Sequence, residues 1–279
     1  IGSERCVIVA PAEDISELRV NQIISLSGGL TFVAISPQRA TSLLLPLMSR
    51  GTCVNPSPRG VTRQFVSVEA REGVSTGISA ADRATTLRAL GAVAPQPRSL
   101  VKPGHVFPLE TREGGSLVKA AIPEAALDIV TLSGHSDAAL FMDLLNPQGE
   151  LMSRESAQSL ADELQAPFFA LSEIIQHRLS GEVLVTRTAE ASLPTREAGE
   201  VRAIVYRSTI DDIEHVALVK GHIDSQHTTL VRVQTEQTTS DVFGGESPPS
   251  REQLVHSLRA IAERENGVLL YLRRAHIPE

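Results

Sequence analysis

Two stretches decide the fold of this chain: residues 73–86, which read GVSTGISAADRATT, and residues 102–109, which read KPGHVFPL. The first stretch begins with glycines and small hydroxyl residues and continues as a helix, for which Ser79 is a suitable cap and Asp82 a suitable first-turn acid. Outward from these stretches, short apolar segments alternate with amphipathic ones. This alternation predicts an α/β or α+β domain.

The first domain is expected to span residues 1–187. Apolar or alternating segments predict its strands at residues 6–10, 30–35, 64–70 and 139–145. Helical periodicity predicts its helices at residues 14–26, 37–48, 79–90, 124–132, 156–165 and 171–179.

A second, smaller domain is expected at residues 200–279. Residues 188–199 are polar and contain Pro194 and Gly199, which predicts a linker between the domains. Beyond it, the pattern predicts an antiparallel sheet and one helix, with strands at residues 201–206, 215–221, 229–233 and 268–272 and the helix at 251–263.

Composition narrows the class of protein. The chain has 279 residues, 42% of them hydrophobic, and carries a net charge of −7 from 33 acidic and 26 basic residues. This charge argues against nonspecific nucleic-acid binding, and no apolar run approaches the ~18 residues of a membrane span. A cytoplasmic protein with neither nucleic-acid nor membrane partners is expected, with Cys6 and Cys53 as reduced thiols.

The two opening stretches resemble 3,4-dihydroxy-2-butanone 4-phosphate synthase, a riboflavin-pathway family that cuts ribulose 5-phosphate into a four-carbon phosphate and formate. The second half, with EHVALVKG at 214–221, SDVFGG at 240–245 and GVLLYLR at 267–273, resembles the first part of GTP cyclohydrolase II. This order is that of the bifunctional riboflavin-synthesis protein. The resemblance implies an α/β (α+β) synthase-like domain, then a partial, C-terminally truncated cyclohydrolase-like α+β domain, and a homodimer.

Most residues of the family's chemistry have no counterpart at the matching positions. The acidic metal-holding loop is absent between residues 9 and 14. The family's cysteine falls on Phe32, its metal-binding histidine on Ile122, and the following threonine on Pro123. Its acid is matched by Asp143 and its arginine by Lys119. Since isoleucine and proline side chains offer a metal no lone pair, a degenerate pocket without metal ion or cofactor is expected.

The remaining polar residues define a candidate pocket. His105 is the candidate for acid–base work, with Asp143 as its partner. The resemblance implies a ligand-binding set of Phe32, Asp82, Thr85, Thr86, Arg112, Glu113, Lys119, Ile122 and Glu124, with an anion-tolerant region near Lys119, Thr85 and Thr86. A purely structural role, capping and turning the backbone, stays open for Asp82 and Thr85, and structural hydrogen bonding stays open for His105.

The second half also lacks its family's zinc ligands. Three zinc-binding cysteines are matched by Gln237, Pro248 and Ser250, which predicts neither zinc nor GTP hydrolysis. Another metal site at His215, His222 and His227 has no supporting motif spacing, so these histidines are expected to be solvated or structural.

Three hypotheses of function follow. The leading one is a family member that has lost both parental activities and whose pocket binds or transforms a different small molecule without metal, for instance in specialised metabolism. The second is a non-catalytic interaction protein that pairs with an intact riboflavin enzyme or with itself. The third is persistence of the synthase reaction with metal ligands rebuilt from Glu13, Asp14, Glu113 and Asp143.

Overall fold

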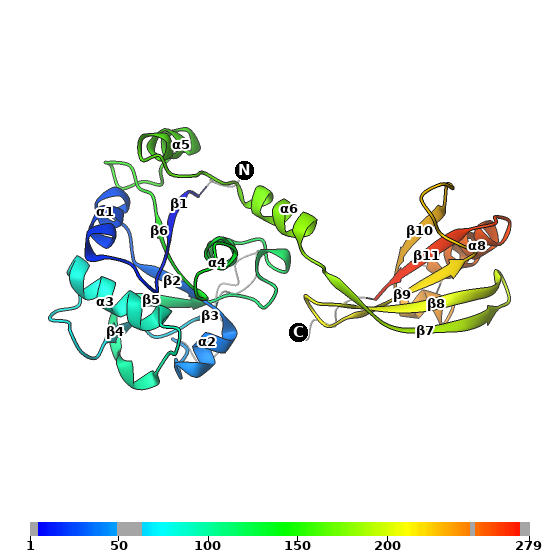
Figure 1. Cartoon of the computed structure of the whole chain (residues 1–279), viewed down its shortest axis with the longest axis horizontal. Coiled ribbons are helices and arrows are strands. Elements are labelled where there is room, and N and C mark those ends of the chain that lie inside the picture. Colours follow the sequence, from blue (N-terminus) through cyan, green and yellow to red (C-terminus); the bar gives the residue numbers. More distant parts are fainter. Residues whose placement is uncertain (1–4, 49–62, 246–248, 274–279) are drawn as a thin grey trace. The chain divides into compact units, whose positions relative to one another are not determined.

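A computed structural model describes residues 5–48, 63–245 and 249–273 of the chain. These residues form two compact units, one ending at Gly181 and one beginning at Glu182 (Figure 1). Both units combine a sheet with helices, as the sequence pattern and the family resemblance predicted. Cys53 and Pro248 lie outside the described residues.

The first unit is built on a mixed sheet with the strand order β1-β6-β2-β5-β3, and β4 also pairs with β5. β2 and β5 are parallel, whereas the other pairs of neighbours are antiparallel. The strands are β1 (Val7–Pro11), β2 (Phe32–Ile35), β3 (Arg63–Gln64), β4 (Val68–Ala70), β5 (Leu100–Glu110) and β6 (Ala138–Asp143).

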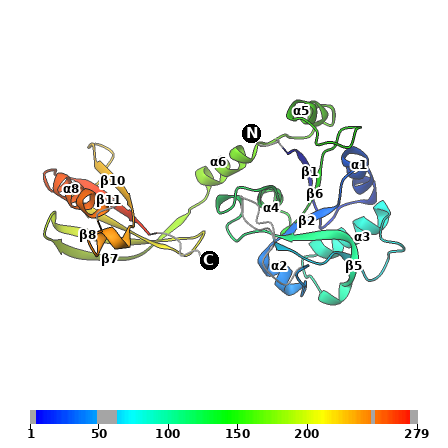
Figure 2. The same ribbon diagram turned by 180° about the vertical axis from the view of Figure 1, so that it is seen from behind.

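Helices cover both faces of this sheet. α1 (Glu17–Ser27) and α3 (Ala80–Gly91) pack on one face, and α4 (Ile122–Leu132) packs on the other (Figures 1 and 2). Because side chains alternate along a strand, Val33 joins the core under α1 and α3 while Ala34 joins the core under α4. The remaining helices of the unit are α2 (Pro37–Ser42), α5 (Arg154–Glu163) and α6 (Leu171–Gly181).

The helix beginnings follow their sequence signals. Ser79 caps α3, since its Oγ accepts a hydrogen bond from the Asp82 backbone N–H at 3.0 Å, as predicted. Ser16 and Ser36 cap α1 and α2 in the same way. α2 ends at Ser42, so the predicted helix at residues 37–48 is shorter than expected.

The second unit is a five-stranded sheet with the order β10-β11-β9-β8-β7. Its elements are β7 (Val185–Thr195), β8 (Gly199–Ser208), β9 (Glu214–Lys220), β10 (Leu230–Thr235), α7 (Thr238–Asp241), α8 (Ser250–Ala262) and β11 (Gly267–Leu272). The prediction of a fully antiparallel sheet is wrong, because β10 and β11 are parallel. α8 supplies the crossover that a parallel pair requires.

Two further predictions differ from the structure. Residues 188–199 are not a linker but form most of β7 and lead into β8. β7 is an edge strand with exposed residues at nearly every position, so it lacks the apolar alternation that marks a strand. The strand predicted at 64–70 is divided into β3 and β4. Residues 102–109, for which the sequence pattern predicted no element, lie inside β5.

Within the described ranges, every helix is too short or too polar to cross a bilayer.

Candidate active site

Three phenylalanines mark one level of the first unit's sheet. Phe32 of β2 pairs with Phe107 of β5 and with Phe141 of β6. The Phe32 ring stacks on Phe141 at 5.5 Å between centroids and lies tilted 6.0 Å from Phe107. Ile122, at the beginning of α4, packs on the same cluster. Two predicted ligand-binding residues, Phe32 and Ile122, therefore share one apolar site under α4.

His105 and Asp143 lie at the same end of the sheet, each two residues past the phenylalanine of its own strand. This end of the sheet is the His105 edge. His105 precedes Phe107 on β5, and Asp143 follows Phe141 on the antiparallel β6. β2 runs between the two strands, so their backbones are separated by two strand spacings, or about 10 Å. The predicted pairing of His105 with Asp143 is therefore wrong. Each side chain has a different partner.

Asp143 pairs with Arg5. Arg5 Nη2 donates to Asp143 Oδ2 at 2.7 Å, and Arg5 Nε donates to Oδ1. The hydrogen bond to Asp143 raises the pKa of Arg5, although partial burial opposes the shift. The edge thus carries a charge pair whose guanidinium is 42% exposed.

His105 pairs with Glu69 of β4. Its Nδ1 lies 3.2 Å from Glu69 Oε2; the carboxylate is buried, while the imidazole is half-exposed. Arg83 of α3 lies nearby and donates from Nη1 to Thr31 Oγ1 at 3.0 Å. Burial lowers the pKa of Arg83, and the Glu69 charge partly offsets that effect. The edge therefore combines an imidazole, two guanidinium groups and the carboxylates of Glu69 and Asp143.

Glu69 was not among the predicted site residues. Its sequence signal is the one charged residue in an alternating stretch, QFVSVEA at 64–70. A buried acid is rare without a partner, so this position alone called for a partner elsewhere in the chain. The sequence did not reveal that this partner is His105.

Asp82, Thr85 and Thr86 hold the backbone around α3. Asp82 accepts hydrogen bonds from Ser75 N at 3.1 Å, Ser75 Oγ at 2.9 Å and Gly77 N at 2.9 Å. Burial raises the pKa of Asp82, but these hydrogen bonds outweigh it and leave the pKa below its ordinary value. Thr86 is fully buried and binds Ala70 N, while Thr85 Oγ1 donates to a carbonyl of its own helix.

Lys119 and Glu124 form another ion pair, in which the Glu124 carboxylate of α4 is fully buried. Lys119 Nζ lies 3.4 Å from Glu124 Oε1, which also accepts from the Arg112 backbone N–H at 3.3 Å. Glu113 is exposed and receives a hydrogen bond from Gln38. Because α3 and α4 cover opposite faces of the sheet, the predicted anion-tolerant region joining Lys119 to Thr85 and Thr86 is not formed.

A group of potential metal ligands lies at the other end of the sheet. Ligand atoms of Glu13, Asp14 and His135 lie within 4.8 Å of one another. Glu13 Oε1 is 2.7 Å from His135 Nδ1, and Oε2 accepts from Ser136 N at 2.9 Å. The hydrogen bond with His135, supported by Ser136, lowers the pKa of Glu13 against a smaller effect of burial.

This donor set of two carboxylates and an imidazole suits Mn²⁺ or Mg²⁺, which take oxygen donors and accept a histidine. Of the four acids proposed as rebuilt ligands, Glu13 and Asp14 come together here, and His135 joins them unpredicted. The group lies where β6 begins, and Asp143 lies where it ends. A strand of this length spans about 17 Å, so the ligand group and the His105 edge are separate.

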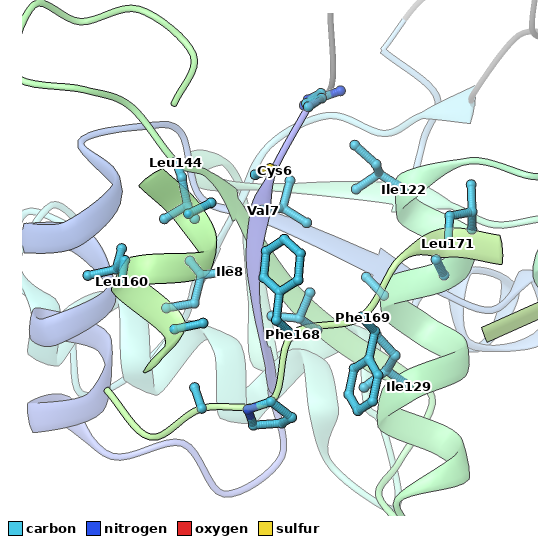
Figure 3. A pocket seen from close by; sticks show the side chains of 18 of the residues that line it. Cys6, Val7, Ile8, Ile122, Ile129, Leu144, Leu160, Phe168, Phe169 and Leu171 are labelled. Atoms are coloured by element: carbon cyan, nitrogen blue, oxygen red, sulfur yellow. The ribbon is translucent and has the colours of Figure 1, made fainter. Parts of the chain in front are cut away.

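A cavity of about 290 Å³ opens beside the apolar cluster (Figure 3). It lies between β1, α4, α5 and the segment leading into α6, with Arg5 as its one charged lining residue among those described. Its lining includes Cys6, Val7, Ile8, Ile122, Ile129, Leu144, Leu160, Phe168, Phe169 and Leu171 (Figure 3). Through Ile122 it adjoins the phenylalanine cluster.

In the second unit, the residues at the cysteine positions have structural contacts. Gln237 donates its backbone N–H to Asp241 at 2.8 Å, and Ser250 accepts from Gln234 at 2.9 Å. His215 accepts from Arg273 N, and His227 contacts Asp224.

Comparison with known proteins gives a family match for each of the two units. Residues 3–177 match the 3,4-dihydroxy-2-butanone 4-phosphate synthase family, and residues 186–277 match GTP cyclohydrolase II. The chain belongs to the bifunctional riboflavin-biosynthesis family. Its GTP cyclohydrolase II domain is partial.

Curated relatives share this organisation. Riboflavin biosynthesis protein RibBA of Chlamydia trachomatis is 34% identical over 95% of this chain and 62% of its own length. RibBA of Nocardia farcinica is 35% identical over 95% of this chain and 64% of its own length. A probable bifunctional riboflavin biosynthesis protein of rice, RIBA 2, is 36% identical over 90% of this chain and 45% of its own length. The chain thus spans about half to two thirds of these relatives.

Solved structures of synthases are also similar to this chain. RibBX of A. baumannii, a two-domain 3,4-dihydroxy-2-butanone 4-phosphate synthase, matches with a TM-score of 0.77 and 27% identity, over 98% of this chain and 75% of its own. A synthase in complex with two magnesium ions matches with a TM-score of 0.58 and 28% identity, over 63% of this chain and 85% of its own.

These findings contradict the leading hypothesis, that both parental activities are lost and the pocket redirected. Relatives aligned over most of the chain are riboflavin-biosynthesis proteins, a two-domain synthase shares nearly the whole fold, and a potential metal-binding group is present. The hypothesis compared this chain with the family only at the positions that match the family's catalytic residues. Folding brings together groups from distant positions, His105 with Glu69 and Glu13 with His135, which that comparison did not detect.

Proposed function

We propose that the first unit catalyses the synthase reaction of its family, the conversion of ribulose 5-phosphate into 3,4-dihydroxy-2-butanone 4-phosphate and formate. The observation that carries this proposal is the match to a two-domain synthase over 98% of the chain. The two products together contain every atom of the substrate, so the reaction consumes neither an oxidant nor a reductant. It requires proton transfers and the binding of a sugar phosphate.

The His105 edge offers groups for both tasks. A half-exposed imidazole beside a buried carboxylate can act as an acceptor and donor of protons. Arg5 and Arg83 supply positive charge at the same edge, and guanidinium groups bind phosphate oxygens with directed hydrogen bonds. These residues support the proposal because they combine proton transfer with anion binding.

A divalent ion, where the reaction requires one, would be held by Glu13, Asp14 and His135. Bound there, it would supply positive charge to an oxygen ligand. This group is separated from the His105 edge by the length of β6, so an ion held there would not contact the groups at that edge.

The test is formate release by the full chain from ribulose 5-phosphate, assayed with Mg²⁺, with Mn²⁺ and with a chelator. Carbon-13 NMR of labelled substrate identifies the four-carbon product. We expect formate and product in equal amounts, and a loss of about 10²-fold or more in His105→Gln. The matched control is His177→Gln on the exposed surface of α6, which should keep its activity. Folded protein that releases no formate above the enzyme-free blank contradicts the proposal.

We also propose that the chain acts as a homodimer, as its resemblance to the synthase family implies. Light scattering on the purified chain tests this, and a monomer mass at assay concentration contradicts it.

A further inference from the structure

β7 is the longest strand of the second unit and lies at one edge of its sheet (Figure 1). β8 pairs with one side of β7, and among the described residues no strand pairs with the other side. All but the last of its 11 residues are exposed. An edge strand of this kind presents a row of backbone N–H and C=O groups to which a further strand can bind.

A β-bulge determines which side chains of β7 share a face. Arg187 pairs with Tyr206 of β8, and Glu190 pairs with Ile204. The two β8 partners are two positions apart, whereas Arg187 and Glu190 are three positions apart, because the bulge adds Thr188 to β7. Side chains two positions apart on a strand point to the same face. Arg187 and Glu190 therefore lie on one face, where they form a partly exposed ion pair.

The bulge lies at the centre of a segment that is complementary to itself. A second copy of β7 can run antiparallel to the first with Thr188 opposite the second copy's Ala189. In this register Arg187 lies opposite the second copy's Glu190, and Glu190 lies opposite the second copy's Arg187. Both residues are on the same face in each copy, so each arginine meets a glutamate across the new pairing.

The uncharged residues fit the same register. Thr186 lies opposite the second copy's Ala191, and the two residues belong to the same face of the sheet. Leu184, directly before the strand, lies opposite the second copy's Leu193, which pairs two apolar side chains. A shift of the register in either direction would move Arg187 away from Glu190 and lose this match.

β10, the strand at the other edge of the sheet, offers no such match. It has six residues, and Arg232 is the one charged residue among them. A second copy of β10 therefore has no acidic residue within the strand to place opposite this arginine. Charge complementarity favours β7 as the edge at which two copies meet.

We propose that β7 is an interface at which two copies of this chain pair antiparallel and join their second units into one continuous sheet. The second copy is bound by backbone hydrogen bonds and by two reciprocal pairs of Arg187 with Glu190. Such a pairing is isologous, so it closes with two copies. It does not depend on the reaction proposed for the first unit, and it assigns a surface that the family resemblance does not.

Charge reversal tests the interface. Arg187→Glu and Glu190→Arg each place like charges opposite each other at two positions, so each should weaken the association at least about 10-fold. The double variant that carries both changes restores opposite charges and should return the dissociation constant to within about 3-fold of the unaltered chain. Sedimentation equilibrium of the full chain over a range of concentrations measures each constant.

The matched control is Arg207→Glu, which reverses one charge of an exposed ion pair with Glu214 on the inner strands β8 and β9. It should leave the association unchanged. Circular dichroism verifies that each variant is folded. Folded single variants that associate as strongly as the unaltered chain overturn the proposal, and so does a double variant that associates no better than the single ones.

Hydrogen exchange of the unaltered chain locates the interface without any variant. Mass spectrometry of peptides that cover β7 should show slower backbone exchange above the dissociation constant than below it, because the second copy takes up the outer N–H groups. Peptides that cover β10 should exchange equally at both concentrations. Protection of β10 in place of β7, or no change at either edge, overturns the proposal.

Discussion

Arg39 and Asp137 form an ion pair that joins α2 to the segment before β6. Arg39 Nε donates to Asp137 Oδ1 at 2.7 Å, and Nη1 donates at 2.8 Å to the Leu90 and Ala92 carbonyls at the end of α3. The guanidinium is 5% exposed. One buried side chain thus satisfies acceptors from two separate segments of the first unit.

Arg39→Met should destabilise the first unit by about 3 kcal/mol, because the buried carbonyls and the carboxylate lose their donors. Urea unfolding of the full chain, followed by circular dichroism, measures the free energy of unfolding. Arg98→Met is the control, since Arg98 is exposed, and it should stay within about 0.5 kcal/mol of the unaltered chain. A change of similar size in both variants would rule out a special role for Arg39.

Asp137 gives the same network a pH dependence. Burial raises its pKa, but the hydrogen bonds from Arg39 and Ser36 outweigh burial and hold the pKa below its ordinary value. A lowered pKa stabilises the fold at pH values above the unfolded pKa of about 3.9, and this contribution is lost as pH falls through the folded pKa. Asp137→Asn should therefore lower stability at neutral pH and weaken its decline towards acid. Unfolding curves from neutral to acid pH measure both, and parallel curves for the two proteins would contradict this.

The sequence predicted most of the helices and strands but few of the side-chain contacts at the candidate site. Strand and helix positions in the first unit followed from apolar periodicity, since one face of each element is buried. β7 was missed because an exposed edge strand has no apolar alternation. The partner of His105 was assigned wrongly because two strand spacings separate Asp143 from it, and strand order is not visible in a single sequence.

The ion pair between Arg5 and Asp143 should contribute little to the free energy of unfolding. Their ion pair is partly exposed, at 42% and 18%, so solvent screens most of its attraction. A double-mutant cycle of Arg5→Gln and Asp143→Asn should give a coupling energy of about 0.2–1 kcal/mol in urea unfolding. A coupling well above this range would mean that the pair is buried in solution, for instance by a second copy of the chain.

Glu13, Asp14 and His135 should bind a divalent ion that the His105 edge does not. Electron paramagnetic resonance of free Mn²⁺ measures binding directly, without any assay of activity. His135→Ala and Glu13→Gln should each weaken Mn²⁺ binding by at least about 10-fold, because each removes a donor of the group. His177→Ala is the matched control on exposed α6, and His105→Gln should also leave binding unchanged. Equal affinity in all four variants would place the ion elsewhere.

Tyr271 should make the second unit sensitive to alkali. Its hydroxyl donates to Asp241 Oδ2 at 2.6 Å; burial and then this hydrogen bond raise the pKa of Tyr271 far above its ordinary value. A raised pKa means that the stabilisation is complete below about pH 10 and is lost as pH rises through the folded pKa. The chain has two tyrosines, so Tyr206→Phe isolates Tyr271. Tyrosinate absorbance of this variant should appear at higher pH in the folded protein than in guanidinium chloride, and coincident titrations would show that Asp241 does not hold the hydroxyl.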